Sequence, residues 1–69
     1  MTNADKMFDK IFYKKETDNI DFIEYDNTIT KYFVRFWKRR RTISFSDIEM
    51  NISLLKAINE KAKELGWYD

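Results

Sequence analysis

The run of residues 20–45, IDFIEYDNTITKYFVRFWKRRRTISF, constrains the fold more than any other part of the chain. β-branched and aromatic residues dominate it, and it contains neither proline nor glycine. Such residues favour strands, because they pack well on a pleated surface. The run therefore predicts three antiparallel strands. The preceding segment 13–19, YKKETDN, forms either a turn or a short fourth strand at an edge, where lysine side chains are common.

Turn residues set the expected strand pairing. Asn and Asp in 26–28 predict the first turn, because they bond to their own backbone and tolerate left-handed conformations. A turn centred on residues 27 and 28 gives one ionic and two apolar pairs: Glu24 with Lys31, Ile23 with Tyr32, and Phe22 with Phe33. A second turn centred on residues 39 and 40 pairs Phe36 with Ile43 and Val34 with Phe45. Two arginines suit a two-residue turn poorly, so a longer, mobile tip is expected, and a register shifted by one residue stays an alternative.

Strand alternation then divides the side chains between two faces of the sheet. The expected core face is uncharged and consists of Ile23, Tyr25, Tyr32, Val34, Phe36, Ile43 and Phe45. The opposite face mixes rings, charges and hydroxyls: Ile20, Phe22, Glu24, Lys31, Phe33, Arg35, Trp37, Ser44 and Ser46. Such a mixed face is typical of a surface that meets water or a partner.

A helix is expected at each end of the chain. Thr2 is a suitable N-cap for the first, with Asp5 three residues on, and its apolar stripe is Met7, Phe8, Ile11 and Phe12. The second begins after Asn51, with a staple between Met50 and Leu55, and its stripe is Leu55, Ile58, Ala62 and Leu65. Gly66 is the expected left-handed C-cap, from which Trp67 folds back. The order predicts an α+β fold in which the C-terminal helix packs on one face of an antiparallel sheet of three or four strands.

The two ends of the chain resemble small uncharacterised phage and prophage proteins of Gram-positive bacteria. The first match is the pattern T-x-A-x-K-M-F, in Thr2, Ala4, Lys6, Met7 and Phe8. The second is the ending L-L-K-A-I to E-L-G-W, in Leu55, Ala57, Ile58, Glu64, Leu65, Gly66 and Trp67. In those proteins the first helix usually continues into E-L-G-Y, whereas here it continues through residues 9–13, DKIFY. The resemblance implies a phage-related origin and no known activity.

Length and composition limit the chemistry of the chain. Its 69 residues make a single domain spanning 1–69, small enough to need its aromatic bulk or self-association for stability. It has no histidine and no cysteine, the usual bases, nucleophiles and zinc ligands, so we expect no enzyme. The acids at 18, 21, 24 and 26 match no ion-binding loop, so we expect no metal and no cofactor. Without a signal peptide or an apolar span, the chain is expected to be soluble and cytoplasmic, in a bacterial host if phage-encoded, with no membrane partner.

Positive charge is concentrated in one stretch. Residues 31–42 carry six positive charges and no acid, whereas residues 1–30 carry seven acids against four lysines. The candidate partner-binding residues are Phe33, Arg35, Trp37, Lys38, Arg39, Arg40 and Arg41. Alternating rings and guanidinium groups can stack on bases and neutralise phosphates. The same pattern also arises where Arg35 stacks on its neighbours within one molecule and the tip keeps a hairpin end solvated.

Three interpretations of this stretch follow. The preferred one is purely intramolecular packing, and contact with a protein partner or with a second copy in a homodimer ranks next. Nucleic acid ranks third, because no RNA-binding consensus is present and the net charge is only +1. The predicted function is therefore a non-catalytic protein-interaction or self-associating module, with nucleic-acid binding as the alternative. The sequence identifies neither the partner nor the oligomeric state.

Overall fold

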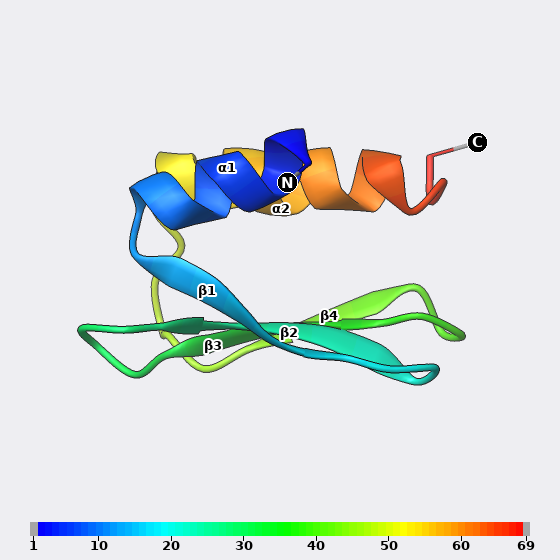
Figure 1. The fold of residues 1–69 in the computed structure, drawn as a ribbon, viewed down its shortest axis with the longest axis horizontal. Coiled ribbons are helices and arrows are strands. Elements are labelled where there is room, and N and C mark those ends of the chain that lie inside the picture. The colour runs from blue at the N-terminus through cyan, green and yellow to red at the C-terminus, as the bar shows by residue number, and fades with distance from the viewer. Residues whose placement is uncertain (1, 69) are drawn as a thin grey trace.

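The computed structural model describes residues 2–68 and shows two helices and four strands (Figure 1). In chain order these are α1 (Asn3–Lys10), β1 (Tyr13–Asp18), β2 (Phe22–Asn27), β3 (Phe33–Trp37), β4 (Thr42–Phe45) and α2 (Ile52–Glu64). The strands form one antiparallel sheet in the order β1-β2-β3-β4. Segment 13–19 therefore does contribute a strand, β1, at one edge of the sheet. The predicted α+β class and the strand region are confirmed.

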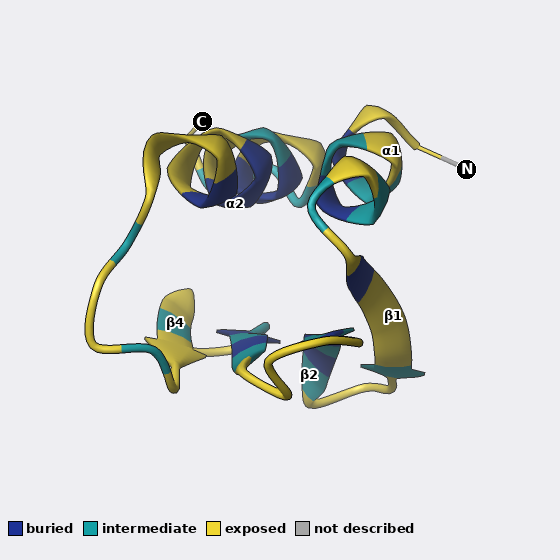
Figure 2. Cartoon of the chain, turned by 90° about the vertical axis from the view of Figure 1, so that its left-hand side faces the viewer, coloured by how far each residue is buried: buried dark blue, intermediate teal, exposed yellow. Residues whose placement is uncertain are grey.

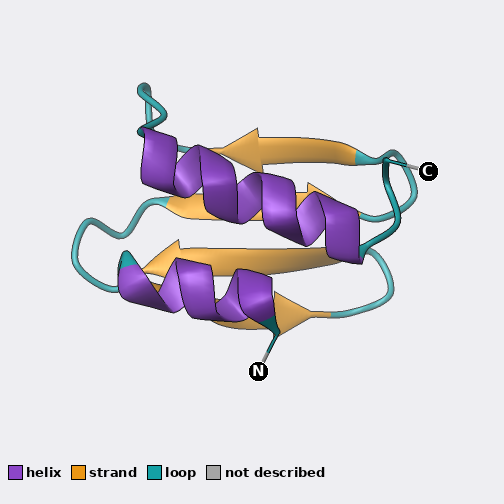
Figure 3. Cartoon of the chain, turned by 90° about the horizontal axis from the view of Figure 1, so that it is seen from above, coloured by secondary structure: helices purple, strands orange, loops and turns teal. Residues whose placement is uncertain are grey.

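Both helices lie side by side on the same face of the sheet (Figures 2 and 3). The predicted packing of the C-terminal helix on the sheet is confirmed, and α1 shares the layer with it. Between the layers lie Phe8 of α1, Tyr25 and Phe36 of the sheet, and Leu54 of α2, each at most 1% exposed. The Phe8 ring stacks on Tyr25 with the ring centres 4.0 Å apart and meets Phe36 edge-on. A two-layer arrangement buries one face of the sheet and leaves the other without a helical cover.

The register predicted for β3 and β4 is confirmed. Val34 pairs with Phe45 and Phe36 with Ile43. As expected, the loop between the strands is longer than a two-residue turn, because Trp37 pairs with Thr42 and residues 38–41 form the loop. The Arg41 N–H donates to the Trp37 carbonyl at 2.9 Å, and Arg41 has a positive φ of 55°. Lengthening the loop about the same centre leaves the register unchanged.

The register predicted for β2 and β3 is wrong. Glu24 pairs with Arg35 instead of Lys31, Ile23 with Phe36 instead of Tyr32, and Phe22 with Trp37 instead of Phe33. The turn is again a four-residue loop, 28–31, closed by a bond from the Lys31 N–H to the Asn27 carbonyl, with Lys31 at a φ of 68°. Asn27 favours this loop because its side-chain oxygen accepts from the N–H groups of residues 29 and 30, at 2.8 and 2.9 Å. The shift of four residues is even, so the strand residues keep their faces.

The predicted core face is partly right. Ile23, Tyr25, Val34 and Phe36 are buried, and Ile43 is half-buried against them. Tyr32 and Phe45 are instead 39% and 43% exposed. Tyr32 precedes β3, and Phe45 lies at the end of the edge strand β4. On the other face, the predicted members Ile20, Lys31 and Ser46 fall outside the strands.

Helix α1 begins as predicted and ends differently. The Thr2 side chain accepts from the Asp5 N–H at 3.1 Å, as expected of an N-cap. Phe12 was predicted to lie on the apolar stripe, but it follows the C-cap with a φ of 71° and is 55% exposed. Its carbonyl accepts from the Thr28 N–H at 2.8 Å, so the reversal ties the end of α1 to the loop after β2. Ala4 is the buried α1 residue that the predicted stripe lacked.

Helix α2 has both predicted caps but a rotated buried stripe. The Asn51 side chain accepts from the Leu54 N–H at 2.8 Å, and Gly66 adopts a φ of 78°. The Trp67 N–H donates to Ala62 and the Gly66 N–H to Lys63, so Trp67 turns back onto the core. Leu55 was predicted in the stripe but is 49% exposed, because α2 packs against α1 as well as against the sheet. The buried residues are Leu54, Ala57, Ile58, Lys61 and Ala62.

Candidate functional site

The candidate site is the sheet face that no helix covers, here called the open face (Figure 2). The registers bring side chains from three strands together on it: Phe22, Glu24 and Asp26 of β2, Phe33, Arg35 and Trp37 of β3, and Ser44 of β4. The β2 and β3 members are all half-buried, which is intermediate between a core and a fully solvated surface. Half-buried rings on an uncovered face are accessible to a partner.

Arg35 lies at the centre of the open face. Its guanidinium carbon is 4.5 Å from the ring centre of Phe22, 5.1 Å from that of Trp37 and 5.3 Å from that of Phe33. Its Nε and Nη2 atoms lie 2.7 and 2.6 Å from the same Glu24 carboxylate oxygen. Cation–π contacts and the ion pair together hold Arg35 in one orientation. Glu24 also neutralises its charge, so Arg35 organises the rings and supplies little net attraction for an anion.

The basic tip, residues 38–41, divides into engaged and solvated side chains. Lys38 donates to the Asp18 carboxylate at 3.1 Å and to the Asn19 carbonyl at 2.6 Å, across the neighbouring loop. Arg40 places its guanidinium 4.9 Å from the Trp37 ring centre. The Trp37 indole N–H donates to the Ser44 hydroxyl at 3.0 Å, which fixes the ring beneath Arg40. Arg39 and Arg41 are exposed.

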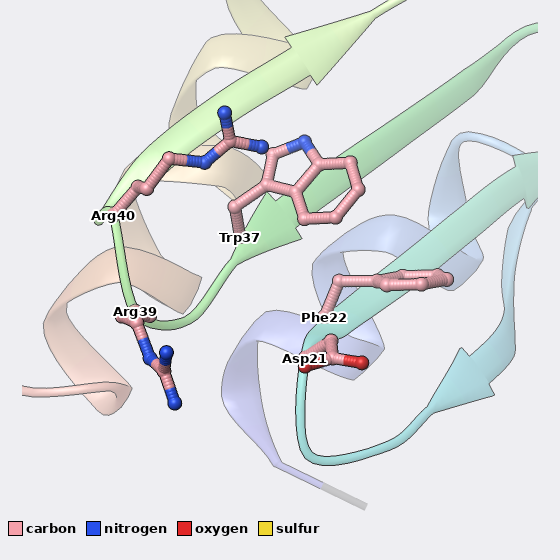
Figure 4. A pocket seen from close by; sticks show the side chains of 5 residues that line it. All are labelled: Asp21, Phe22, Trp37, Arg39 and Arg40. Atoms are coloured by element: carbon pink, nitrogen blue, oxygen red, sulfur yellow. The ribbon is translucent and has the colours of Figure 1, made fainter.

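A shallow hollow connects the open face with the basic tip (Figure 4). Its lining residues are Asp21, Phe22, Trp37, Arg39 and Arg40. Two rings whose centres are 5.1 Å apart form an apolar floor, and two guanidinium groups and one carboxylate surround it. Such a hollow suits an apolar group that carries or adjoins a negative charge.

The other end of the open face is acidic. Burial, a hydrogen bond with Glu24 and the negative charges of Glu24 and Glu16 raise the pKa of Asp26 to about 6, and Arg35 opposes them only in part. The Asp26 Oδ1 atom is buried, and within the described residues 2–68 it has no hydrogen-bond partner. The raised pKa shows that this end of the face disfavours added negative charge.

The structure therefore brings together three of the sequence-predicted site residues, Phe33, Arg35 and Trp37, on one surface. Lys38, Arg39, Arg40 and Arg41 lie together in the adjoining loop, although Lys38 is turned back onto its own chain. Asp21 and Phe22 complete the hollow but were not predicted as site residues. The missing signal was the β2–β3 register, because the pairing of Phe22 with Trp37 follows only from the four-residue loop.

The Ser44 hydroxyl accepts a hydrogen bond from the Trp37 indole N–H, and the Ser46 hydroxyl accepts one from the Phe33 N–H. Within residues 2–68, no three carboxylates, histidines or cysteines are grouped closely enough to hold a metal ion. Over the same residues, neither helix has the length and apolar character that crossing a membrane requires.

Comparison of the chain with protein-family models, with curated proteins and with solved structures finds no match in any of the three. The fold and the open face therefore define the class of the protein on their own: a small two-layer α+β domain with one uncovered sheet face.

Proposed function

We propose that this domain is a non-catalytic interaction module that binds a protein partner through its open face and basic tip. The observation that carries the proposal is the group of three half-exposed rings, Phe22, Phe33 and Trp37, held around Arg35 on a surface that no helix covers. Rings fixed in advance lose little conformational freedom when a partner binds, and aromatic and arginine side chains are enriched at protein interfaces. The partner surface that fits presents apolar groups to the rings and carboxylates to the tip.

Electrostatics favours a protein over a nucleic acid. Two of the six positive charges in residues 31–42, on Arg35 and Lys38, are already paired with carboxylates. The acidic end around Asp26 would repel the continuing phosphate backbone of a bound strand. Nucleic-acid binding remains the second candidate, because Arg40 over Trp37 offers a stacking surface beside the exposed Arg39 and Arg41.

The proposed biological setting is the cytoplasm of a bacterium that carries the phage or prophage. This part of the proposal depends on the resemblance of the terminal helices to small phage proteins. The absence of histidine and cysteine from the sequence supports the non-catalytic assignment.

The test compares wild type with Trp37→Ala, using Ile29→Ala as a control for an exposed apolar residue in the loop 28–31, at the opposite end of the β2–β3 pair from Trp37. Cross-linking mass spectrometry in a bacterial host extract should recover a protein partner with contacts mapping to the open face. We expect the Trp37 variant to lose at least about tenfold of the recovered partner and the control to keep it. Recovery that is equal for all three proteins would contradict the proposal.

Nucleic-acid binding is measured separately, by fluorescence anisotropy with single-stranded and duplex oligonucleotides. We expect no binding at low salt. Binding that weakens steeply with salt, and whose salt slope falls in the Arg39→Ala plus Arg40→Ala variant, would favour the second candidate.

A further inference from the structure

The two edges of the sheet differ in how they are protected. The edge strand β1 carries the exposed charges of residues 14–16, and its pairing with β2 is interrupted by a bulge between Lys15 and Thr17. The edge strand β4 reads Thr-Ile-Ser-Phe, has no charge, and pairs with β3 without interruption. Charges and bulges are the usual means by which proteins prevent pairing between sheet edges. The β4 edge lacks both.

The free backbone groups of β4 belong to Ile43 and Phe45. The Ser46 N–H donates to the Phe33 carbonyl at 3.1 Å, which marks the pair of Phe33 and Ser46 as hydrogen-bonded. Hydrogen-bonded and non-hydrogen-bonded pairs alternate along an antiparallel ladder, so Ser44 and Thr42 bond to β3 whereas Ile43 and Phe45 do not. The N–H and C=O groups of Ile43 and Phe45 therefore lie in the plane of the sheet and point outward, away from β3.

Apolar side chains accompany this free edge. Ile43 is half-buried and Phe45 is 43% exposed, both on the helix side of β4. Ser53 of α2 lines a groove together with Met7 of α1, so this flank of α2 faces α1. Leu55 is 49% exposed and lies on the opposite flank of α2, away from α1. The flank of α2 that faces away from α1 lies above the β4 side of the sheet (Figure 3). The edge thus offers free hydrogen-bonding groups with apolar surface beside them.

We propose that two copies of this chain associate through antiparallel pairing of their β4 strands. The register that uses both outward-pointing residues of β4 is centred on Ser44. It pairs Ile43 of each copy with Phe45 of the other through their free N–H and C=O groups, and places the two serines face to face. The apolar pairs lie on the helix side, so the two sheets continue into each other and the two open faces form one surface.

Charge complementarity selects a second copy as the occupant of this edge. In the register centred on Ser44, Arg41 of one copy stands opposite Asp47 of the other, with Glu49 close by in sequence. The basic tip precedes β4 and the acidic segment follows it, so an antiparallel arrangement brings opposite charges together at both ends. A parallel arrangement, or an unrelated neutral strand, would not do so.

This assignment goes beyond the proposed function, because it uses a different surface and names the partner of that surface. The two fail separately, since Trp37→Ala tests the open face and Phe45→Lys tests the edge. A four-residue edge and a few apolar side chains form a small interface, so we expect a dissociation constant in the micromolar range.

The first experiment measures the solution mass of the full chain by sedimentation over protein concentrations from about 5 to about 500 µM, where mass action populates a weak dimer. We expect a monomer–dimer equilibrium with no larger species. Phe45→Lys should raise the dissociation constant at least about tenfold, and the control Ile29→Lys should leave it unchanged. A monomer at every concentration, larger assemblies, or a dimer unaffected by Phe45→Lys would overturn the proposal.

A charge exchange keeps the test valid if Phe45→Lys disturbs the fold. One variant carries Arg41→Glu, and the other carries Asp47→Lys with Glu49→Lys. In the homodimer of either variant, like charges meet at both ends of the paired strands, so its dissociation constant should rise about tenfold. In a mixed dimer of the two variants, opposite charges meet again at both ends. Mixing should recover dimerisation to within about threefold of wild type. A mixture no tighter than either variant would show that β4 does not pair with β4, and that any partner strand comes from a different protein.

Discussion

Arg35 and Asp26 carry opposite charges on the same open face, and the two residues differ in the charges that surround them. Arg35 has the Glu24 carboxylate and three rings around it, so its charge is compensated where it lies. Asp26 has two other acids nearby, and burial together with these acids raises its pKa from 3.8 to about 6. The folded chain therefore binds the Asp26 proton more tightly than the unfolded chain does.

The sign of the resulting pH dependence follows from linkage. Between pH 3.8 and about 6, Asp26 is protonated more often in the folded state than in the unfolded state. The free energy of unfolding therefore falls as the pH rises through this range. Above about pH 6 the decline that Asp26 causes is complete. We expect Asp26→Asn to remove that decline and to raise the free energy of unfolding by about 1 kcal/mol above pH 7, a discounted figure because the side chain is partly exposed. Urea unfolding from pH 4 to 8 measures it.

The matched control is Asp21→Asn, since Asp21 is an exposed acid in the loop before β2. Its pH profile should parallel that of wild type. An Asp26→Asn profile that also parallels wild type would show that the acidic end of the open face carries no such cost.

At the scale of the elements, the C-cap of each helix is followed by a residue with a positive φ, but the two residues are of different types. Gly66 follows the C-cap of α2 with a φ of 78°, and Phe12 follows the C-cap of α1 with a φ of 71°. A left-handed conformation is free of steric cost for glycine and costs a bulky residue about 1 kcal/mol.

Phe12→Gly should therefore stabilise the chain by about 0.5–1 kcal/mol, because the exposed ring has little packing to lose. The reciprocal change Gly66→Ala should destabilise it by about 1 kcal/mol at a position with nearly the same φ. Both values come from urea midpoints followed by circular dichroism. A loss of stability in Phe12→Gly would mean that the ring contributes packing that its 55% exposure does not reveal.

Strand periodicity and helix caps made much of the fold predictable from the sequence. Alternation identified Ile23, Tyr25, Val34 and Phe36 as core, and Asn51 and Gly66 bounded α2 correctly. The length of the loop 28–31 was not predictable in the same way, because this loop depends on Lys31, a residue other than glycine, in a left-handed conformation. The apolar stripe predicted for α2 also omitted Leu54, since the rotation of α2 about its own axis depends on its contact with α1.

The candidate site was predictable to a similar degree. Sequence alternation alone places Phe33, Arg35 and Trp37 on one face. Phe22 and Asp21 joined the hollow only through the pairing of β2 with β3, which depends on the loop at 28–31. The ion pair between Arg35 and Glu24 follows from the same pairing. It neutralises one of the six positive charges of residues 31–42.

For the whole molecule, stability depends on a core that few residues form. A domain of this size has about 3–5 kcal/mol of stability to lose. Trp67 lies beyond the end of α2 and packs on the core, with its ring centre 6.0 Å from that of Phe36. Trp67 thus helps to close the two layers after the end of α2.

Trp67→Ala should lower the free energy of unfolding by about 2 kcal/mol, less than for a fully buried ring because Trp67 is half-buried. The neighbouring change Tyr68→Ala removes a ring that is 63% exposed and should cost much less. Thermal unfolding at a fixed protein concentration compares the two. Equal losses would show that Trp67 does not close the core.

The even offset between the predicted and observed β2–β3 pairings has a consequence for how chains of this kind can diverge. Side chains alternate with a period of two, so a slip of β3 along β2 by an even number of residues preserves which members of each strand point inward. A slip of one residue would oppose an inward side chain to an outward one, and would demand a bulge or an inverted strand. Related chains should therefore keep the β2–β3 pairing or shift it by an even number of residues, whatever the length of the loop between the strands.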